Sequence, residues 1–172
     1  MDAATSFEAL VRNHAPEIEA FLRKLCGNRH DAEELAQDVF VKAYRKIDTL
    51  RDAAAARRWL FTIAVNHFND WVTPEKRRAQ AALEPLDEGI AIAALDRSPH
   101  EHAAAGELSN WIADAVARLP ERQRVVLLMF MARGFDYAEI AESLGISADA
   151  VKMSLFHARE KLRDRMERFF GS

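Results

Sequence analysis

The stretch YAEIAESLGISADAVKMSLF, Tyr137–Phe156, has the spacing of two short helices joined by a tight turn. Such a helix pair needs a small residue where the helices cross, a glycine in the turn and an apolar residue that pins the second helix. Ala141, Gly145 and Val151 stand at these three offsets. Ser147 is a favourable N-cap residue for the second helix. The pattern predicts a helix-turn-helix, a motif that places its second helix in the major groove of DNA.

The outward side chains of that second helix are the expected DNA contacts, and they are Lys152, Met153, Ser154, Phe156, His157 and Arg159. The last helix carries six basic and three acidic residues between Lys152 and Arg168, whereas the whole chain has 24 basic and 27 acidic residues and a formal charge of −3. A basic patch is the usual feature of a nucleic-acid-binding surface. The charge that favours DNA binding is therefore found in this helix and not in the net charge of the chain. A plain helical hairpin without DNA binding is the alternative interpretation.

The rest of the chain also favours helices. Apolar residues recur at steps of three and four, and the 172 residues include only six glycines and five prolines. Thr5 is expected to open the first helix with a capping box, Pro16 to kink or restart it, and Asp31 to cap the second. Pro74 is expected to end a third helix near Val72. These patterns predict an all-α protein.

Residues 79–106 differ in composition from both sides of the chain. They contain five acidic residues, one basic residue (Arg97), two prolines and many alanines. We expect a flexible acidic linker here, with room for a short helix. It would join two small helical domains, residues 1–78 and residues 107–172, and the second of these contains the helix-turn-helix.

Several classes of protein and site are disfavoured by the sequence. Its longest clear apolar run, Val125–Ala132, is far shorter than the roughly 20 residues of a membrane span, and the N-terminus does not resemble a signal peptide, so we expect a cytoplasmic protein without membrane insertion. Cys26 lies in an apolar stripe and is expected to be a buried thiol. His100 and His102 lack further ligands nearby, so we expect a solvated linker and no metal site. We find no catalytic or cofactor motif and expect no enzyme.

Further stretches carry a family resemblance that covers nearly the whole chain apart from the linker. FDYAEIAESLGISADAVKMSLFHAREKLRD, preceded by LPERQRVVLL, resembles the C-terminal domain of bacterial extracytoplasmic-function (ECF) sigma factors of the sigma-70 group. DAEELAQDVFVKAYRKIDTL and RRWLFTIAVNHFNDW resemble the N-terminal domain of the same group. The resemblance implies a protein that binds core RNA polymerase, at the β′ clamp helices and the β subunit, and directs it to promoter DNA. It also implies a controlling anti-sigma factor.

The resemblance further implies roles for individual residues. The polymerase-binding positions are Glu34, Gln37, Asp38 and Tyr44. For Glu34 and Asp38 a solvated helix face is the alternative interpretation. The −10 element would be read by Arg57, Asn66 and Asp70, and the loop 49–57 would capture a flipped base. Trp59 is expected to be core rather than a melting wedge. The −35 element would be read by the outward residues of the last helix.

The chain departs from the common pattern of the family at a few positions. Ala56 stands where an aromatic residue is frequent, and Ser154 and His157 stand where arginines are common. Fewer fixed charges on the last helix imply a different −35 sequence or a weaker contact. Two rival functions follow from the residues alone: an autonomous helix-turn-helix regulator, and a helical adaptor that binds proteins but not DNA.

Overall fold

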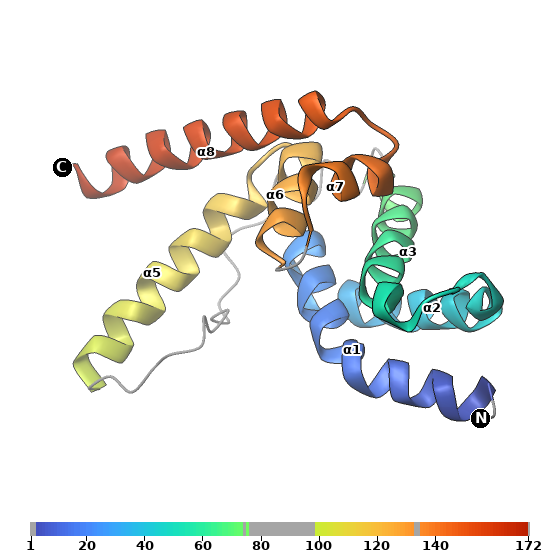
Figure 1. Ribbon diagram of the computed structural model, residues 1–172. Coiled ribbons are helices and arrows are strands. Elements are labelled where there is room, and N and C mark those ends of the chain that lie inside the picture. The colour runs from blue at the N-terminus through green and yellow to red at the C-terminus, as the bar shows by residue number, and fades with distance from the viewer. Residues whose placement is uncertain (1–2, 74, 76–98, 133–134, 172) are drawn as a thin grey trace.

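The structure is a computed structural model that describes residues 3–73, 75, 99–132 and 135–171 (Figure 1). Side chains are described for residues 7–73, 75, 108–132, 135–169 and 171. The basic run 76–78, most of the expected linker and the side chains of His100 and His102 therefore lie outside the described residues. In the described ranges all regular elements are helical, which confirms the all-α fold.

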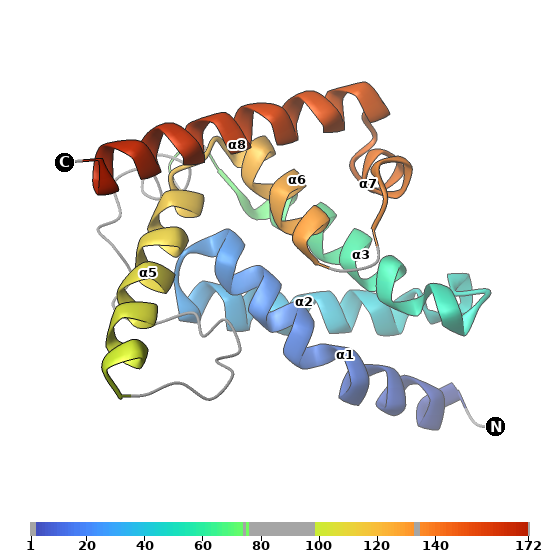
Figure 2. The ribbon, with the colours of Figure 1, turned by 60° about the vertical axis from the view of Figure 1, so that its left-hand side comes forward.

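Two groups of helices follow one another along the chain (Figures 1 and 2). The N-terminal half consists of α1 (Ala3–Cys26), α2 (Arg29–Arg45), two short 3₁₀ turns (Ile47–Thr49 and Ala53–Ala55) and α3 (Ala56–Trp71). The C-terminal half consists of α5 (Pro99–Ala117), α6 (Glu121–Met131), α7 (Tyr137–Leu144) and α8 (Ala148–Phe170). Helix α8 passes along α7, α6 and α5, and the two chain ends lie at opposite sides of the molecule.

Several helix boundaries differ from the sequence-based expectation. Helix α1 begins before Thr5 and runs through Pro16 as one helix, so it neither starts at the expected capping box nor restarts at the proline. Helix α2 begins at Arg29 because Asn28 is its N-cap, and the Asn28 side chain accepts a hydrogen bond from the Asp31 backbone N–H (2.9 Å). Asp31 thus lies in the first turn, where its charge favours the helix dipole.

Other boundaries follow ordinary glycine and proline preferences. Gly27 follows α1 in the left-handed region (φ 77°), which glycine adopts without strain, and its N–H donates to the Arg23 carbonyl. Helix α3 ends at Trp71, as expected from Pro74. Helix α5 begins at Pro99, inside the stretch expected to be linker, and proline at the first position of a helix loses no hydrogen bond.

The two halves share one continuous apolar core. In the N-terminal half, Ile18, Leu22, Leu35, Leu60 and Phe68 are almost fully buried where α1, α2 and α3 meet, and Cys26 is buried as expected. In the C-terminal half the corresponding residues are Met129, Ile140, Val151 and Leu155. Each such side chain stabilises the fold by about 1.5–3 kcal/mol. The halves meet where α6 contacts α1 and where α7 contacts α3.

Candidate protein and nucleic-acid interfaces

The helix-turn-helix is built by local hydrogen bonds at both of its helix starts. Helix α7 begins with a capping box, in which the Glu139 N–H donates to Asp136 Oδ1 (2.8 Å) and the Asp136 N–H donates to Glu139 Oε2 (3.0 Å). Gly145 forms the turn at φ 62°, a left-handed conformation that favours glycine. Ser147 then caps α8 by accepting from the Ala150 N–H (3.1 Å). The geometry confirms the predicted turn and the predicted start of the second helix.

The outer face of α8 carries most of the residues expected to contact DNA. Lys152, Met153, Phe156, His157 and Arg159 are exposed. Phe156 and Met153 are each more than half exposed, which is unusual for large apolar side chains on a surface. The outer face of α8 therefore presents two exposed apolar side chains beside its basic ones.

Ser154 does not share that face. Its exposed fraction is 8%, because it lies on the buried side of α8 with Val151, Leu155 and Ala158. The expectation that Ser154 points outward is therefore wrong. The spacing explains the error, since Ser154 follows Val151 by three residues and precedes Ala158 by four, which keeps it on the inner side of the helix.

The four expected polymerase-binding residues form one exposed stripe along α2. Glu34, Gln37, Asp38 and Tyr44 are exposed, and Val41 lies between them at helical spacing with 48% of its surface exposed. Sequence reasoning missed Val41, although its position seven residues after Glu34 was a usable signal. An exposed apolar side chain inside a polar stripe is typical of a protein-binding face.

Two of the stripe residues are held in place by neighbouring helices. Asp38 Oδ2 lies 3.1 Å from His67 Nε2, and the other ring nitrogen of His67 lies 2.7 Å from Lys42 Nζ. This arrangement fits a neutral His67 that accepts from Lys42 and donates to Asp38. Tyr44 packs edge-on against Phe7 of α1, with ring centroids 5.2 Å apart.

Glu33 lies one helical turn before Gln37, at the edge of the stripe on α2. Its carboxylate accepts a hydrogen bond from Arg29 Nε (2.6 Å). The hydrogen bond and charge of Arg29 lower the pKa of Glu33, which stays exposed. Glu33 is thus an exposed carboxylate at the edge of the stripe whose partner is Arg29.

The three residues expected at the −10 element have different surroundings. Asn66 and Asp70 are exposed, one helical turn apart on α3. Arg57 is half-buried and forms a bidentate ion pair with Glu17 of α1 (Nε to Oε2, 2.9 Å). Its guanidinium also lies over the rings of Phe61 (5.0 Å) and Phe135 (5.3 Å). Arg57 therefore joins the two halves of the protein in this structure.

The loop 49–57, expected to capture a base, borders a hollow between the two halves. Thr49, Arg51, Asp52, Trp59 and Thr62 line it from the N-terminal half, and Glu142 and Ser143 line it from α7. Trp59 is half-buried and packs against the core, and its indole N–H donates to Thr49 Oγ1 (3.1 Å). The indole thus fixes one side of the loop.

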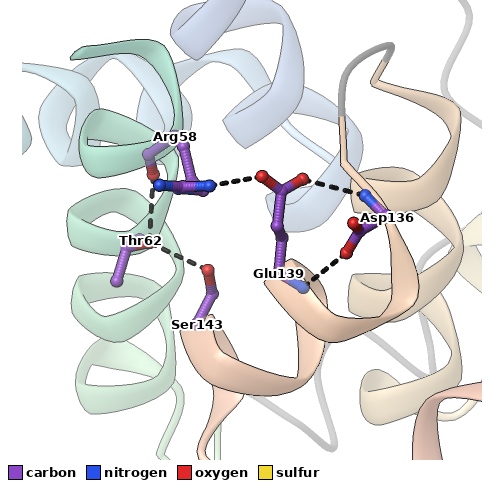
Figure 3. A network of polar contacts seen from close by, with 5 residues as sticks. All are labelled: Arg58, Thr62, Asp136, Glu139 and Ser143. Carbon is purple, nitrogen blue, oxygen red and sulfur yellow. Dashed lines mark hydrogen bonds and ion pairs between the residues drawn. The ribbon is translucent and has the colours of Figure 1, made fainter. Parts of the chain in front are cut away.

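A polar network connects α3 to α7 beside that hollow (Figure 3). Arg58 forms an ion pair with Glu139, and the hydroxyl groups of Thr62 and Ser143 lie 2.9 Å apart. Glu139 uses its second oxygen for the capping box of α7. Neither contact between α3 and α7 was predictable from the helical pattern, because each joins residues 81 positions apart.

The described residues show little that favours other kinds of site. Within the ranges listed for Figure 1, no group of three or more His, Cys, Asp or Glu side chains is arranged to hold a metal ion. No helix described there is both long and apolar enough to cross a membrane. The candidate surfaces are the outer face of α8, the exposed stripe of α2 and the hollow beside the loop 49–57.

The sequence matches two parts of a single family. Residues 10–78 match the family described as Sigma-70 region 2, and residues 109–162 match the one described as Sigma-70, region 4. The first match includes the exposed stripe of α2 and the residues Asn66 and Asp70 of α3. The second match includes the helix-turn-helix. The two matched parts occur in the order expected from the resemblance.

Characterised relatives align along nearly the whole chain. The ECF RNA polymerase sigma factor SigE of Mycolicibacterium smegmatis is 30% identical over 163 residues, which are 94% of this chain and 62% of the relative. The ECF RNA polymerase sigma-E factor of Haemophilus influenzae is 28% identical and SigW of Bacillus subtilis is 29% identical, each over 94% of this chain. The chain covers 88% and 89% of those two proteins, respectively.

Solved structures share the fold. The sigma factor RpoE from Bartonella quintana, in complex with the anti-sigma factor NepR, aligns with a TM-score of 0.71 at 24% identity over 94% of this chain and 97% of that one. CnrH in complex with the cytosolic domain of CnrY aligns with a TM-score of 0.65 at 23% identity, over 96% of this chain and 90% of that one. The family matches and the relatives agree: this chain belongs to the ECF group of the sigma-70 family of sigma factors.

Proposed function

We propose that this protein binds core RNA polymerase and directs it to specific promoters, as an alternative sigma factor of the ECF type. Its family consists of transcription initiation factors and not of enzymes. The observation that carries the proposal is the exposed stripe of α2, which has the apolar and acidic side chains of a protein-binding face and stands on the same chain as a complete helix-turn-helix.

In this proposal each interface has its own partner. Glu34, Gln37, Asp38 and Tyr44, joined by Val41, bind the clamp helices of the polymerase β′ subunit. Asn66 and Asp70, with the loop 49–57, contact the −10 element. The outer face of α8 reads the −35 element through the following exposed residues: Lys152, Met153, Phe156, His157 and Arg159. The cytoplasm is the expected compartment, because the polymerase acts there.

Two further features belong to the proposal. The domains are expected at residues 1–78 and 107–172, with the acidic segment 79–106 between them. Control by an anti-sigma factor is supported by the fold shared with RpoE and CnrH, whose structures contain NepR and CnrY, respectively. A modest net charge fits this function, because the polymerase supplies most of the electrostatic attraction for DNA.

Run-off transcription tests the proposed function. The purified chain is added to core polymerase with a pool of promoter fragments, and the transcripts are sequenced. A sigma factor yields discrete start sites that are absent when core polymerase acts alone. An autonomous regulator would instead bind duplex DNA without polymerase, and a protein-binding adaptor would bind polymerase without producing specific starts; either result would contradict the proposal.

A further inference from the structure

We propose that His67 is a positioning residue for polymerase binding, which fixes one oxygen of the Asp38 carboxylate and keeps the Lys42 ammonium group away from it. The proposal rests on the proposed function, because Asp38 belongs to the surface expected to bind the polymerase. His67 itself lies on α3 and is not part of the α2 stripe. Its role therefore depends on how α2 and α3 pack, and the helical pattern of α2 does not reveal it.

The ring of His67 lies between two side chains that would otherwise suit each other. Asp38 and Lys42 are four residues apart on α2, the spacing at which a carboxylate and an ammonium group commonly pair. In the described part of the chain they form no ion pair with each other. Lys42 Nζ is instead 2.7 Å from His67 Nδ1, and His67 Nε2 is 3.1 Å from Asp38 Oδ2. The imidazole thus replaces a direct contact within α2.

The two partners of the ring determine which nitrogen carries its proton. The ammonium group of Lys42 can only donate, so Nδ1 of His67 must accept and carries no hydrogen. The proton of the neutral ring is then on Nε2, where it donates to the Asp38 carboxylate. A doubly protonated ring would direct an N–H at the ammonium group and lose that hydrogen bond. The arrangement therefore selects the neutral Nε2–H tautomer.

The burial of the ring suits a positioning role. The side chain of His67 is 13% exposed, whereas that of Asp38 is 60% exposed. Phe68, the next residue of α3, is fully buried, so the backbone that carries His67 is fixed by the core. Ordering a side chain costs conformational entropy, and here that cost is met in the free protein and not during binding. The exposed carboxylate is therefore preorganised for a partner.

The ring also affects the charge of the stripe. A direct contact with the Lys42 ammonium group would partly neutralise the Asp38 carboxylate. With the imidazole between them, only Oδ2 of Asp38 is used, and Oδ1 makes no hydrogen bond to any residue that the structure describes. One carboxylate oxygen therefore stays available to a donor from the polymerase.

The tautomer provides a test that needs no polymerase. Long-range proton–nitrogen NMR spectra of the isotope-labelled full chain show which ring nitrogen carries the proton, and His67→Gln identifies the signals of His67 by their loss. We expect the Nε2–H tautomer at neutral pH. Lys42→Met should shift the Nδ1 resonance, because that nitrogen loses its hydrogen bond, whereas Lys46→Met, one turn further along α2, should not. A different protonation state, or equal behaviour of the two lysine variants, would overturn the proposal.

Polymerase binding tests the role itself. His67→Leu removes the ring and lets Asp38 pair with Lys42, so we expect the affinity for core polymerase to fall roughly five- to tenfold, about the effect of one charge-assisted hydrogen bond. His67→Gln should recover most of this loss, because one amide group can accept from Lys42 and donate to Asp38. Calorimetric titration of the full chain measures both affinities. Equal losses in the two variants would show that the hydrogen bonds of the ring do not matter.

The effect should also disappear when Asp38 is removed. In an Asp38→Ala background, His67→Leu should change the affinity by less than about twofold, because the side chain that it positions is absent. A loss as large as in the wild-type background would show that His67 acts through the fold or another contact, which would overturn the proposal. Absence of binding by the wild-type chain would instead contradict the proposed function, and the NMR spectra would show separately whether the ring contacts exist.

Discussion

The exposed stripe of α2 lies beside a second row of side chains on α3, the α3 ridge, which consists of Arg58, Thr62, Asn66 and Asp70. The two rows differ in their contacts with the C-terminal half. The side chains of the α2 stripe are exposed. Asp38 contacts His67, and Tyr44 packs against Phe7. In the first half of the α3 ridge, Arg58 and Thr62 contact Glu139 and Ser143 of α7, and the Arg58 side chain stays 44% exposed. One expected partner surface is therefore available in the free chain, and the other is partly used internally.

This difference matters for the choice of variants. A substitution in the α2 stripe changes an open surface, whereas a substitution at Arg58 or Thr62 also changes the contact between α3 and α7. Variants that separate the two surfaces therefore test the comparison more sharply than variants that destroy both.

Phe135→Ala should have the largest effect, because it removes the buried aromatic contact between the halves while leaving the α2 stripe intact. We expect the free energy of unfolding to fall by about 3 kcal/mol, the lower part of the range for a buried phenylalanine. Urea denaturation followed by tryptophan fluorescence measures the change. Phe156→Ala, at a position 54% exposed, should change the stability by less than about 0.5 kcal/mol. Similar losses in both variants would show that Phe135 does not join the halves.

Asp38→Arg should produce the next largest effect, now on the open surface. A reversed charge in the middle of the stripe, next to His67, should weaken binding to core polymerase by about 2 kcal/mol, roughly thirtyfold, with the fold unchanged. Calorimetric titration measures the affinity. Glu19→Arg makes the same charge reversal at an exposed position of α1, outside the stripe, and it should bind almost normally. A comparable loss in Glu19→Arg would mean that only the net charge of the protein matters.

The sequence predicted local features well because they depend on neighbouring residues. The left-handed Gly145, the cap at Ser147 and the end of α3 before Pro74 all follow from short-range conformational rules. One helix start was predicted wrongly because two nearby side chains could each cap the helix. Asn28 lies three residues before Asp31, and its side chain took the capping position that Asp31 was expected to fill.

Contacts between the halves could not be predicted in this way. The hydrogen bond between Thr62 and Ser143 and the ion pair between Arg58 and Glu139 depend on how two helix groups pack, which no periodic pattern in one helix reveals. Arg57 illustrates the consequence, since its expected DNA contact came from family resemblance while its present partners are Glu17 and two aromatic rings. The site roles of Asn66, Asp70 and the α8 residues stay predictions.

Lys152→Ala extends the comparison to the outer face of α8, which is open like the α2 stripe. Lys152 is exposed near the start of the reading helix, with only a weak 3.3 Å contact to Asp149. We expect the variant to change the free-energy difference between promoters that differ at particular −35 base pairs, by about 1 kcal/mol or somewhat more, because base contacts carry sequence information. Transcription by reconstituted holoenzyme on a library of −35 variants measures it. A uniform drop across the library would identify Lys152 as a backbone contact.

His157→Arg should have the smallest effect, spread evenly over promoters. His157 is exposed more than one turn beyond Lys152 and stacks edge-on with Phe156, so phosphate is its expected contact. A fixed positive charge there should strengthen binding to all −35 variants by about 0.5–1 kcal/mol and steepen the slope of log affinity against log salt by about one, since one more counterion is released. Holoenzyme binding at several salt concentrations measures both quantities. Glu167→Gln gives the same change in net charge farther along α8, and it should alter neither; if it steepens the slope equally, the effect comes from the overall charge of the helix and His157 has no phosphate contact of its own.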